Sequence, residues 1–310
     1  MFEKSYKPQL ASELQVESRN WWTRNPMSYD WHGTNTAPEG TPEFFAEIDR
    51  RFFGASPFFS GKRPFAKLIP FDTLKNKSVL EIGCGQGSHT QLLVEAGCDV
   101  TAIDITARAV SLTKQRLALN GLRANVSEMD AEQMKFPDSQ FDFVWSWGVI
   151  HHSAHTDRIV SQVARVLKPG AEFRFMVYNR QAFDSYMKIV RGLLTGKALR
   201  GMCMADILSF YTDGYVARFY TKRELRTLIE DNTLRIGSLS VLGQTSELLP
   251  LPGKGSLGQL KYNLLARFPA VVSERALRHI GSFLFAIARK DAGPGLLPRP
   301  GRGSHSISRH

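Results

Sequence analysis

The sequence predicts an α/β fold in which helices cover both faces of a mostly parallel sheet of seven strands. From Ser78 to Tyr178, short apolar runs alternate with helical segments of roughly 10 to 15 residues, a pattern typical of parallel sheets with right-handed crossovers. A glycine-rich turn at 83–87 joins the first apolar run to the first helix. The run at 141–147 has the composition of a buried strand.

Each element follows from a local pattern. Strands are expected at 78–82, 99–105, 123–129, 141–147, 172–178, 235–242 and 282–289. The helices among the first five strands are expected at 86–96, 106–120 and 155–167, and they end at Gly97, Gly121 and Pro169-Gly170. Thr221 and Glu224 have the spacing of a capping box, which predicts a helix as far as about Asp231.

The alternation breaks after Asn179. Residues 182–207 are expected to form one basic helical segment, and another helix is expected from the Pro- and Gly-rich stretch 249–258 to about residue 280. Residues 1–76 are rich in aromatic and turn-forming residues, which indicates an arm of short helices and loops. Residues 291–310, with their Gly, Pro, Ser and Arg, indicate a disordered tail.

Composition excludes several classes of protein. With 43% hydrophobic and 22% charged residues among 310, the chain is neither mainly disordered nor fibrous. Three scattered cysteines cannot form a disulfide framework and suit a reducing compartment. Neither a transmembrane run nor a secretory signal is expected, so the expected location is cytoplasmic.

The net charge of +11 is unevenly spread. Residues 1–180 hold 21 basic and 20 acidic side chains, whereas residues 181–310 hold 19 and 9, a balance of +10. An anionic partner or surface would explain this excess, and so would a basic tail. Lys188, Arg191, Lys197 and Arg200 alternate with leucines and isoleucine, which suits either peripheral contact with a membrane surface or an ordinary solvated helix face.

The glycine turn is typical of a loop that holds a nucleotide-type cofactor, because glycines let the backbone approach a ligand closely. Its spacing is G-x-G-x-G, and Ser88 stands where a dinucleotide-binding turn would need its last glycine. Glu81, just before the turn, would suit a cationic ligand better than a pyrophosphate. Asp104 ends the second strand, where a carboxylate can accept both ribose hydroxyls, and Asp130 ends the third.

These motifs resemble those of class I S-adenosylmethionine-dependent methyltransferases, and most closely the small-molecule branch that includes ubiquinone- and menaquinone-biosynthesis enzymes. The similarity is carried by VLEIGCGQGSHT at 79–90, VTAIDIT at 100–106, EMDAEQMKFPDSQFDFVWSWGVIHH at 128–152 and RVLKPGAEFRF at 165–175. It implies a Rossmann-like domain at 77–290 with an antiparallel last strand, and S-adenosylmethionine as the cofactor. Compared with many members of this family, segments 180–220 and 243–281 are insertions. They stand at places where the family often has acceptor-binding elements.

The resemblance also implies roles for single residues. Residues near the methionine and ribose parts of the cofactor would be Glu81, Gly83, Gly85 and Gly87. Asp104, with Ile105 beside it, would hold the ribose, and Asp130 with Ala131 would contact the adenine. Asp130 could instead serve only as a helix cap.

Further candidates lie close to where the methyl group would be transferred. His152, and second His151, are candidate general bases for an acceptor hydroxyl, although packing roles are the alternative. No metal is expected, because the clearest candidate ligands are these adjacent histidines, which on a strand would point to opposite faces. Of Trp145 and Trp147, one is expected to face the core and the other, Trp147, the cofactor.

Two other segments could shape the site. Four aromatic residues of the N-terminal arm could fold over the cofactor as a lid that excludes water, or could form only a small hydrophobic cluster: Trp21, Trp22, Tyr29 and Trp31. The segment 211–214, Tyr-Thr-Asp-Gly, either lines the acceptor pocket or forms a simple turn.

The expected function is methyl transfer to a small molecule, first of all O-methylation of a hydroxyl or carboxyl group by in-line transfer. Alternatives are C-methylation of a quinone-like, polyketide-like or lipid acceptor, RNA methylation, and a cofactor-binding protein without catalysis. RNA is disfavoured because the chain shows no base-methylation motif of the Asn/Asp-Pro-Pro-Tyr type and no RNA-binding module. The oligomeric state stays open.

Overall fold

The computed structural model describes residues 11–29, 36–249, 251 and 255–292. Expectations for Trp31 and for the tail 293–310 lie outside the described residues. The strands are β1 Ser78–Ile82, β2 Asp99–Asp104, β3 Asn125–Glu128, β4 Phe141–Trp147, β5 Leu167–Asn179, β6 Phe219–Tyr220, β7 Leu234–Leu242 and β8 Phe283–Lys290.

Helices precede, connect and follow these strands. The α-helices are α1 Ala11–Arg24, α2 Pro42–Gly54, α3 Phe71–Leu74, α4 Ser88–Glu95, α5 Ala107–Leu119, α6 Thr156–Val166, α7 Phe183–Leu194, α8 Met204–Phe210, α9 Lys222–Glu230, α10 Gly255–Leu265 and α11 Ala270–Ile280. The described residues also form four short 3₁₀ helices: η1 Ala131–Gln133, η2 Ile150–His152, η3 Ala198–Arg200 and η4 Thr245–Leu248.

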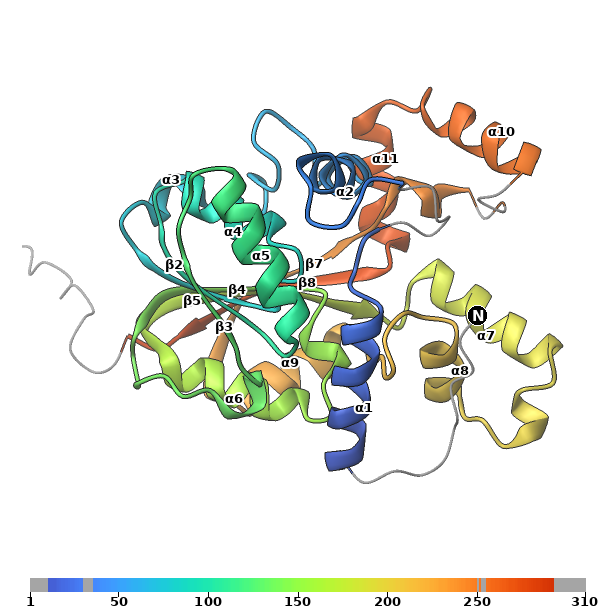
Figure 1. Cartoon of the computed structure of the whole chain (residues 1–310). Coiled ribbons are helices and arrows are strands. Elements are labelled where there is room, and N and C mark those ends of the chain that lie inside the picture. The colour runs from blue at the N-terminus through green and yellow to red at the C-terminus, as the bar shows by residue number, and fades with distance from the viewer. Residues whose placement is uncertain (1–10, 30–35, 250, 252–254, 293–310) are drawn as a thin grey trace, which may run out of the picture.

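The strands form one sheet in the order β3-β2-β1-β4-β5-β8-β7 (Figure 1). The two-residue β6 lies outside this order and pairs with β5. The pairs among β1 to β5 are parallel. β8 runs antiparallel to both β5 and β7, with Phe175 opposite Ala286 in the first pair. The predicted α/β fold with an antiparallel last strand is therefore confirmed, and the short β6 is the strand that the sequence did not predict.

Two hydrophobic cores lie on the two faces of the sheet, as alternation along the strands requires. Val79 belongs to one core together with residues of α4 and α5, whereas its neighbour Leu80 belongs to the other together with residues of α6 and α9. Figure 1 shows these helix pairs on opposite sides of the sheet. The aromatic residues of 52–65 join the first core, where the ring centroids of Phe59 and Trp147 are 5.0 Å apart.

Three predicted segments differ from the structure. The helix expected at 155–167 is present as α6, but β5 begins at Leu167 instead of Glu172, so Pro169-Gly170 lies inside the strand, beside an irregularity in its pairing with β4. Residues 182–207 form two helices, α7 and α8, because the chain turns at Gly196 and Gly201, whose φ angles are 68° and 81°. The helix expected as far as residue 280 is likewise divided into α10 and α11, with Pro269 capping the second.

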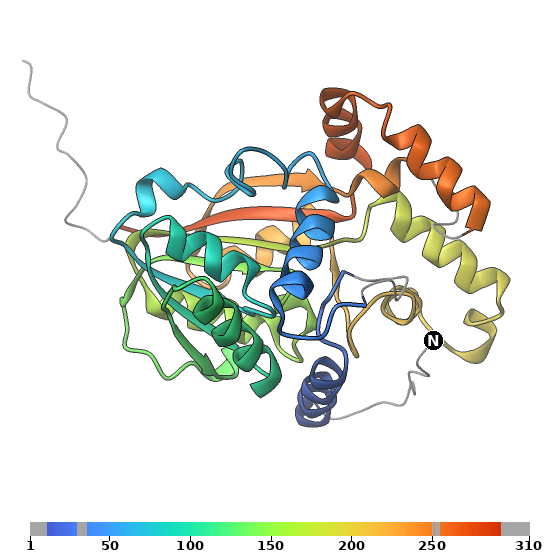
Figure 2. The same cartoon turned by 45° about the horizontal axis from the view of Figure 1, so that its top comes forward.

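The capping box at Thr221 was predicted correctly. The Glu224 N–H donates to Thr221 Oγ1 at 3.2 Å, and the Thr221 N–H donates to Glu224 Oε2 at 2.8 Å. Among the described residues, no helix combines the length and apolar character needed to cross a membrane. Figures 1 and 2 show α7, α8 and α10 projecting from one end of the molecule, beyond the sheet.

Candidate active site

A cavity of about 600 Å³ lies at the carboxyl ends of β1, β2 and β4. One end is lined by the glycine turn and by the residues that follow β2 and β3. The other end is lined by residues of α7, of the 211–213 segment and of the chain around η4. Residues of the N-terminal arm border the cavity as well, so three separate parts of the sequence meet there.

The glycine turn forms the floor of the first end. The backbone N–H groups of Gly83 and Cys84 donate to the Ile103 carbonyl at 2.7 and 3.1 Å, which ties the turn to β2. Gly83 has φ 79°, and a Cβ there would lie 2.2 Å from Val149 Cγ2. Gly85 has φ 53°, and a Cβ there would meet no atom within 4 Å, so the backbone is open toward the cavity.

Asp104 lies at the cavity edge beside this turn. Its Oδ2 accepts from the Gly85 N–H at 3.1 Å, and its Oδ1 accepts from the Thr106 N–H and Oγ1, both at 3.0 Å. Burial raises the pKa of the Asp104 carboxyl, although these donors oppose the shift. Oδ1 already accepts two hydrogen bonds, whereas Oδ2 accepts one and keeps acceptor capacity for a further hydroxyl. Ile105, next in the chain, also lines the cavity.

Two of the predicted cofactor residues lie behind the cavity wall. Glu81 is buried among protein atoms and accepts from Thr90 Oγ1 at 2.5 Å, and burial raises its pKa to about 8. Gly87 has φ 81° and packs against Thr113 and Arg116. Both residues support the shape of the glycine turn, and neither lines the cavity.

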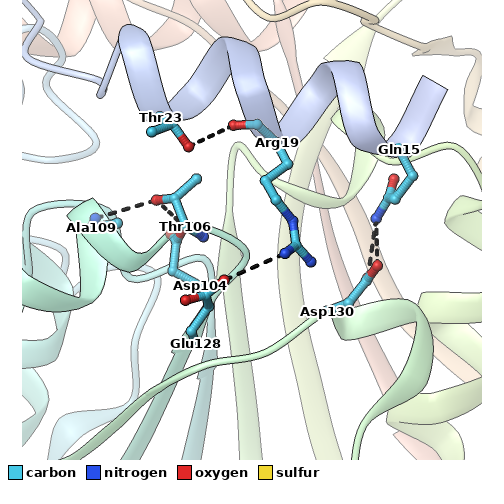
Figure 3. A network of polar contacts seen from close by, with 8 residues as sticks. All are labelled: Gln15, Arg19, Thr23, Asp104, Thr106, Ala109, Glu128 and Asp130. Carbon is cyan, nitrogen blue, oxygen red and sulfur yellow. Dashed lines mark hydrogen bonds and ion pairs between the residues drawn. The ribbon is translucent and has the colours of Figure 1, made fainter. Parts of the chain in front are cut away.

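Asp130 and Ala131 line the cavity at the end of β3, as the sequence predicts. Asp130 Oδ1 accepts from the Glu132 N–H at 2.9 Å, so the side chain also caps η1. Figure 3 shows α1 facing this edge, where Gln15 reaches Asp130 and Arg19 reaches Glu128 at 3.4 Å. Asp130 therefore both caps η1 and lines the cavity.

The two histidines differ in their surroundings. His152 lines the cavity, and its Nδ1 lies 2.7 Å from the Val216 carbonyl oxygen. A ring nitrogen at that distance from a carbonyl carries the hydrogen, which leaves Nε2 as the basic nitrogen of the neutral ring. His151 is fully buried away from the cavity lining, and burial lowers its pKa well below the ordinary value.

The expectation that these histidines point to opposite faces of a strand was wrong. They lie on η2, after β4 has ended, and their ring centroids are 4.3 Å apart. Among the described residues, no group of three or more His, Cys, Asp or Glu side chains could hold a metal ion.

The expected placement of Trp145 in the core and Trp147 at the cavity is present, but its expected reason, that the two side chains face opposite sides of the sheet, was wrong. Residues two apart on a strand share a face, and these rings stack at 5.7 Å with an angle of 11° between them. Trp147 is one pleat nearer the strand end, so it lines the cavity, whereas Trp145 lies in the core beneath it.

The N-terminal arm contacts the cavity through part of its aromatic set. Trp22 packs edge-on against the His152 ring at 5.0 Å, and Tyr29 stacks on Phe52 at 4.2 Å. Both line the cavity, whereas Trp21 packs against Trp22 outside the lining. Polar contacts add to this cover: Ser18 Oγ donates to the His152 carbonyl at 2.9 Å, and Gln86 Nε2 donates to the Met27 carbonyl at 2.7 Å.

The second end of the cavity holds polar residues that sequence reasoning missed. They are Tyr178, Asp184, Lys188, Glu247 and Lys261, which line the cavity among apolar side chains. Glu247 Oε1 accepts from the Gln244 N–H at 2.7 Å and Oε2 from the Ser282 N–H at 2.8 Å, and burial raises its pKa to about 7. Because these residues come from unrelated segments, the chain offers no local motif that would have brought them together.

The segment 211–214 both lines the cavity and forms a turn. Tyr211, Thr212 and Asp213 line the cavity, and the chain turns there. Gly214 has φ 84°, and a Cβ there would lie 2.5 Å from His152 Nδ1. The glycine therefore leaves room for the histidine ring.

The first end of the cavity fits an adenosine-type ligand. An open glycine backbone, a carboxylate that follows β2 and a second carboxylate that follows β3 are the groups that hold a nucleoside beside a parallel sheet. Residues 80–175 match the family model described as a methyltransferase domain. The chain carries a class I methyltransferase domain. S-adenosylmethionine is the cofactor that this domain implies, and the open Gly85 backbone and the carboxylate of Asp104 fit it.

Curated relatives of the methyltransferase domain act on small molecules. A ubiquinone biosynthesis O-methyltransferase of Coxiella burnetii is 28% identical over 120 residues, which is 39% of this chain and 51% of the relative. The corresponding protein of Aromatoleum aromaticum is 27% identical over 192 residues, 59% of this chain and 80% of the relative. A sterol 4-C-methyltransferase of Caenorhabditis elegans is 28% identical, covering 37% of this chain and 34% of the relative. The chain spans about half the length of the first of these relatives.

Solved structures support the fold. An S-adenosylmethionine-dependent methyltransferase of Methanosarcina mazei aligns with a TM-score of 0.50 at 22% identity, over 70% of this chain and 93% of that one. The [4+2]-cyclase SpnF aligns with the same TM-score at 18% identity, over 74% of this chain and 78% of that one. At these identities the likeness concerns architecture, so the reaction has to be argued from the site.

Proposed function

We propose that the protein transfers a methyl group from S-adenosylmethionine to an oxygen of a small, lipophilic acceptor. The observation that carries the proposal is a single cavity lined both by the nucleoside-type residues and by a second set of mixed character, in which the His152 ring contacts Trp22 of the arm and Tyr178 of the second set. When bound, the cofactor supplies an electrophilic methyl group on a sulfonium. The protein has to align the acceptor with that methyl group and to take up the proton that the acceptor hydroxyl loses.

The chain's own residues divide this work. Gly83 and Gly85 let the backbone approach the cofactor, Asp104 accepts from its ribose, and Asp130 with Ala131 borders its adenine. Glu81 and Gly87 shape the turn from behind. These are proposed roles, and Ile105 and Trp147 complete the same end of the cavity as apolar walls.

His152 takes the proton of the acceptor hydroxyl in this proposal. The Val216 carbonyl fixes the hydrogen on Nδ1, so Nε2 can accept the proton that the acceptor loses as its new O–C bond forms. The Trp22 ring holds the imidazole from the arm side. His151 is proposed to act only as a packing residue, because it does not line the cavity.

The character of the second end supports a lipophilic acceptor. Its lining combines the polar groups named above with apolar and aromatic side chains, including Phe183, Met187, Phe219, Leu251 and Phe283. A cavity of this kind with a few polar groups suits a small organic ligand. It does not suit a nucleic-acid strand, which would need an extended basic groove with stacking aromatics.

Methylation of carbon is the second candidate, because the relatives include both an O-methyltransferase and a sterol C-methyltransferase. A polar group able to accept a proton serves either reaction. The acceptor atom therefore has to be found by experiment.

The test uses the full chain with S-adenosylmethionine whose methyl group is deuterated, and a panel of phenolic and quinol acceptors. Each acceptor is paired with an analogue whose hydroxyl is already capped by a methyl group. Label in the free-hydroxyl compound alone is the expected result, with one S-adenosylhomocysteine formed for each label. Label in both members indicates methylation of carbon, and cofactor binding with no label in any compound indicates a protein without this catalysis.

A further inference from the structure

Exposed apolar side chains are concentrated on one part of this molecule. Of the eighteen large apolar side chains that are exposed among the described residues, sixteen lie between residues 183 and 272. The two exceptions are Val16 and Leu119. We call the sixteen the apolar rim: Phe183, Tyr186, Met187, Val190, Leu193, Leu194, Leu199, Met204, Leu251, Leu257, Leu260, Tyr262, Leu264, Phe268, Val271 and Val272.

The degree of exposure is large for several of these residues. Leu194 is 83% exposed, Leu199 93% and Val271 78%. Single apolar residues on a surface need no explanation, but a concentration of this size marks an interaction site or a binding groove. The helices that carry the rim are the insertions that distinguish this chain from the family pattern.

The rim adjoins the second end of the cavity through Phe183, Met187 and Leu251. Phe183, Met187 and Lys188 of α7 line the cavity, and so do Leu251 and, from α10, Lys261. Figures 1 and 2 both show α7 and α10 projecting from the same end of the molecule. Whatever contacts the rim therefore also lies beside the acceptor end of the cavity.

Basic residues accompany the apolar ones. Residues 183–210 hold four basic and two acidic side chains, a net charge of +2. Residues 255–280 hold four basic side chains and one acidic side chain, a net charge of +3. Lys197 Nζ lies 3.6 Å from the centroid of the Phe210 ring, and Arg191 lies 4.8 Å from that of Tyr211. These contacts keep cationic groups close to the apolar surface of α7 and α8.

We propose that the apolar rim docks the protein on an anionic phospholipid bilayer. Leucine, valine and aromatic side chains on short helices with nearby lysine and arginine are the combination that binds the membrane interface, where the apolar groups enter the acyl boundary and the cations meet anionic headgroups. The basic balance of both insertions favours an anionic surface over a neutral one. The docking itself is independent of the proposed methyl transfer.

The experiment measures sedimentation of the full chain with vesicles. One set contains phosphatidylcholine with phosphatidylglycerol, and the other contains phosphatidylcholine alone. We expect binding to the mixed vesicles that weakens as salt rises, because screening reduces the attraction of the headgroups for the cations. The double variant Leu194→Glu/Leu199→Glu should reduce binding about tenfold or more, since two apolar groups are lost and two charges gained.

The matched control is Val16→Glu/Leu119→Glu, which places the same two charges at the two exposed apolar residues outside the rim. It should bind vesicles like the parent. Circular dichroism and cofactor affinity show whether each variant keeps its fold. Absence of binding at low salt, or an equal loss in rim and control variants, would overturn the proposal. So would a dimer in sedimentation velocity that only the rim variant dissociates, since the rim would then bind a second copy of this chain.

Discussion

Gln15 Nε2 lies 3.0 Å from both carboxylate oxygens of Asp130, so one side chain of α1 ties the N-terminal arm to the end of β3. The Oε1 of the same amide accepts from the Ala154 N–H at 3.0 Å. Both contacts lie at the part of the cavity lining that contains Gln15, Asp130 and Ser153. Gln15 is therefore the residue through which the arm can be loosened with the smallest change.

Replacing Gln15 by alanine should loosen the arm and speed the dissociation of S-adenosylmethionine. Loss of hydrogen bonds worth about 0.5–1.5 kcal/mol each corresponds to a rate increase of roughly three- to tenfold or more. Stopped-flow displacement of the cofactor measures this rate. Asn20→Ala, an exposed position on the same helix, is the control and should behave like the parent. A dissociation rate in Gln15→Ala that is unchanged or slower would contradict the role of the arm as a cover.

Asp104→Asn should weaken binding of S-adenosylmethionine at least about tenfold, because an amide accepts hydroxyl donors less well than a carboxylate and loses the charge. Titration calorimetry measures the affinity. Asp99 lies exposed at the other end of the same strand, so Asp99→Asn makes the same chemical change away from the cavity. Equal affinities in the two variants would remove Asp104 from the site.

Gly83 and Gly85 should respond differently to alanine. The methyl group of Gly83→Ala would lie 2.2 Å from Val149, so this variant should lose stability by about 2 kcal/mol or more in urea denaturation. Gly85→Ala meets no protein atom within 4 Å and should lose only about 1 kcal/mol from its positive φ. Its main defect should be weaker cofactor binding, because the added methyl group enters the cavity. The reverse order of stabilities would show that the turn packs differently.

His152→Asn and His151→Asn should separate catalysis from packing. The first should lower turnover by about a hundredfold with cofactor affinity unchanged, as expected for loss of a general base. The second should lower the melting temperature, because it places an amide where a fully buried ring packs against Tyr178 at 4.1 Å. Full activity in His152→Asn would exclude this residue as the base.

The buried carboxyl of Glu81 should make stability depend on pH. Its pKa is raised from the ordinary 4.5 to about 8, so the folded protein keeps a proton that the unfolded chain releases. This stability is fully present below pH 4.5 and is lost as the pH rises to about 8, with a slope of at most about 1.4 kcal/mol per pH unit. Glu81→Gln should flatten this part of the profile in urea denaturation without cofactor.

Glu95→Gln, a change at an exposed position of α4, is the control for the pH profile and should keep the parental slope. An unchanged slope in Glu81→Gln would mean that other groups cause the dependence. The experiment is done without ligand because a bound sulfonium would favour the ionised carboxylate.

The strands of the central domain were predictable because each is short, apolar and bounded by glycine or by a change of period. The boundaries that failed depended on tertiary structure. Pairing with β4 keeps Pro169-Gly170 inside β5, although both residues are typical helix stops. Trp145 and Trp147 share a face because residues two apart on any strand do, so their common side follows from the sequence alone.

The site was predictable where one motif carries it and not where several segments meet. Gly83, Gly85, Asp104 and Asp130 follow strands whose order is fixed by the α/β pattern, and all four line the cavity. Glu247 enters the cavity because η4 packs against the start of β8, a contact between residues 35 positions apart that no local pattern encodes. The sequence could not show which of the two adjacent histidines lines the cavity, because that depends on how η2 packs: His151 is buried and His152 borders the cavity.

Helices α1 and α7 contribute different parts of the lining of one cavity. If the proposed function holds, we expect exchange of the nucleoside product to break the contacts of Gln15 and Ser18, and exchange of the acceptor to leave them intact. The two exchanges can therefore be slowed or accelerated separately by substitution. In steady-state kinetics, changes in the arm should alter inhibition by the spent cofactor, and changes in α7 should alter the apparent affinity for the acceptor.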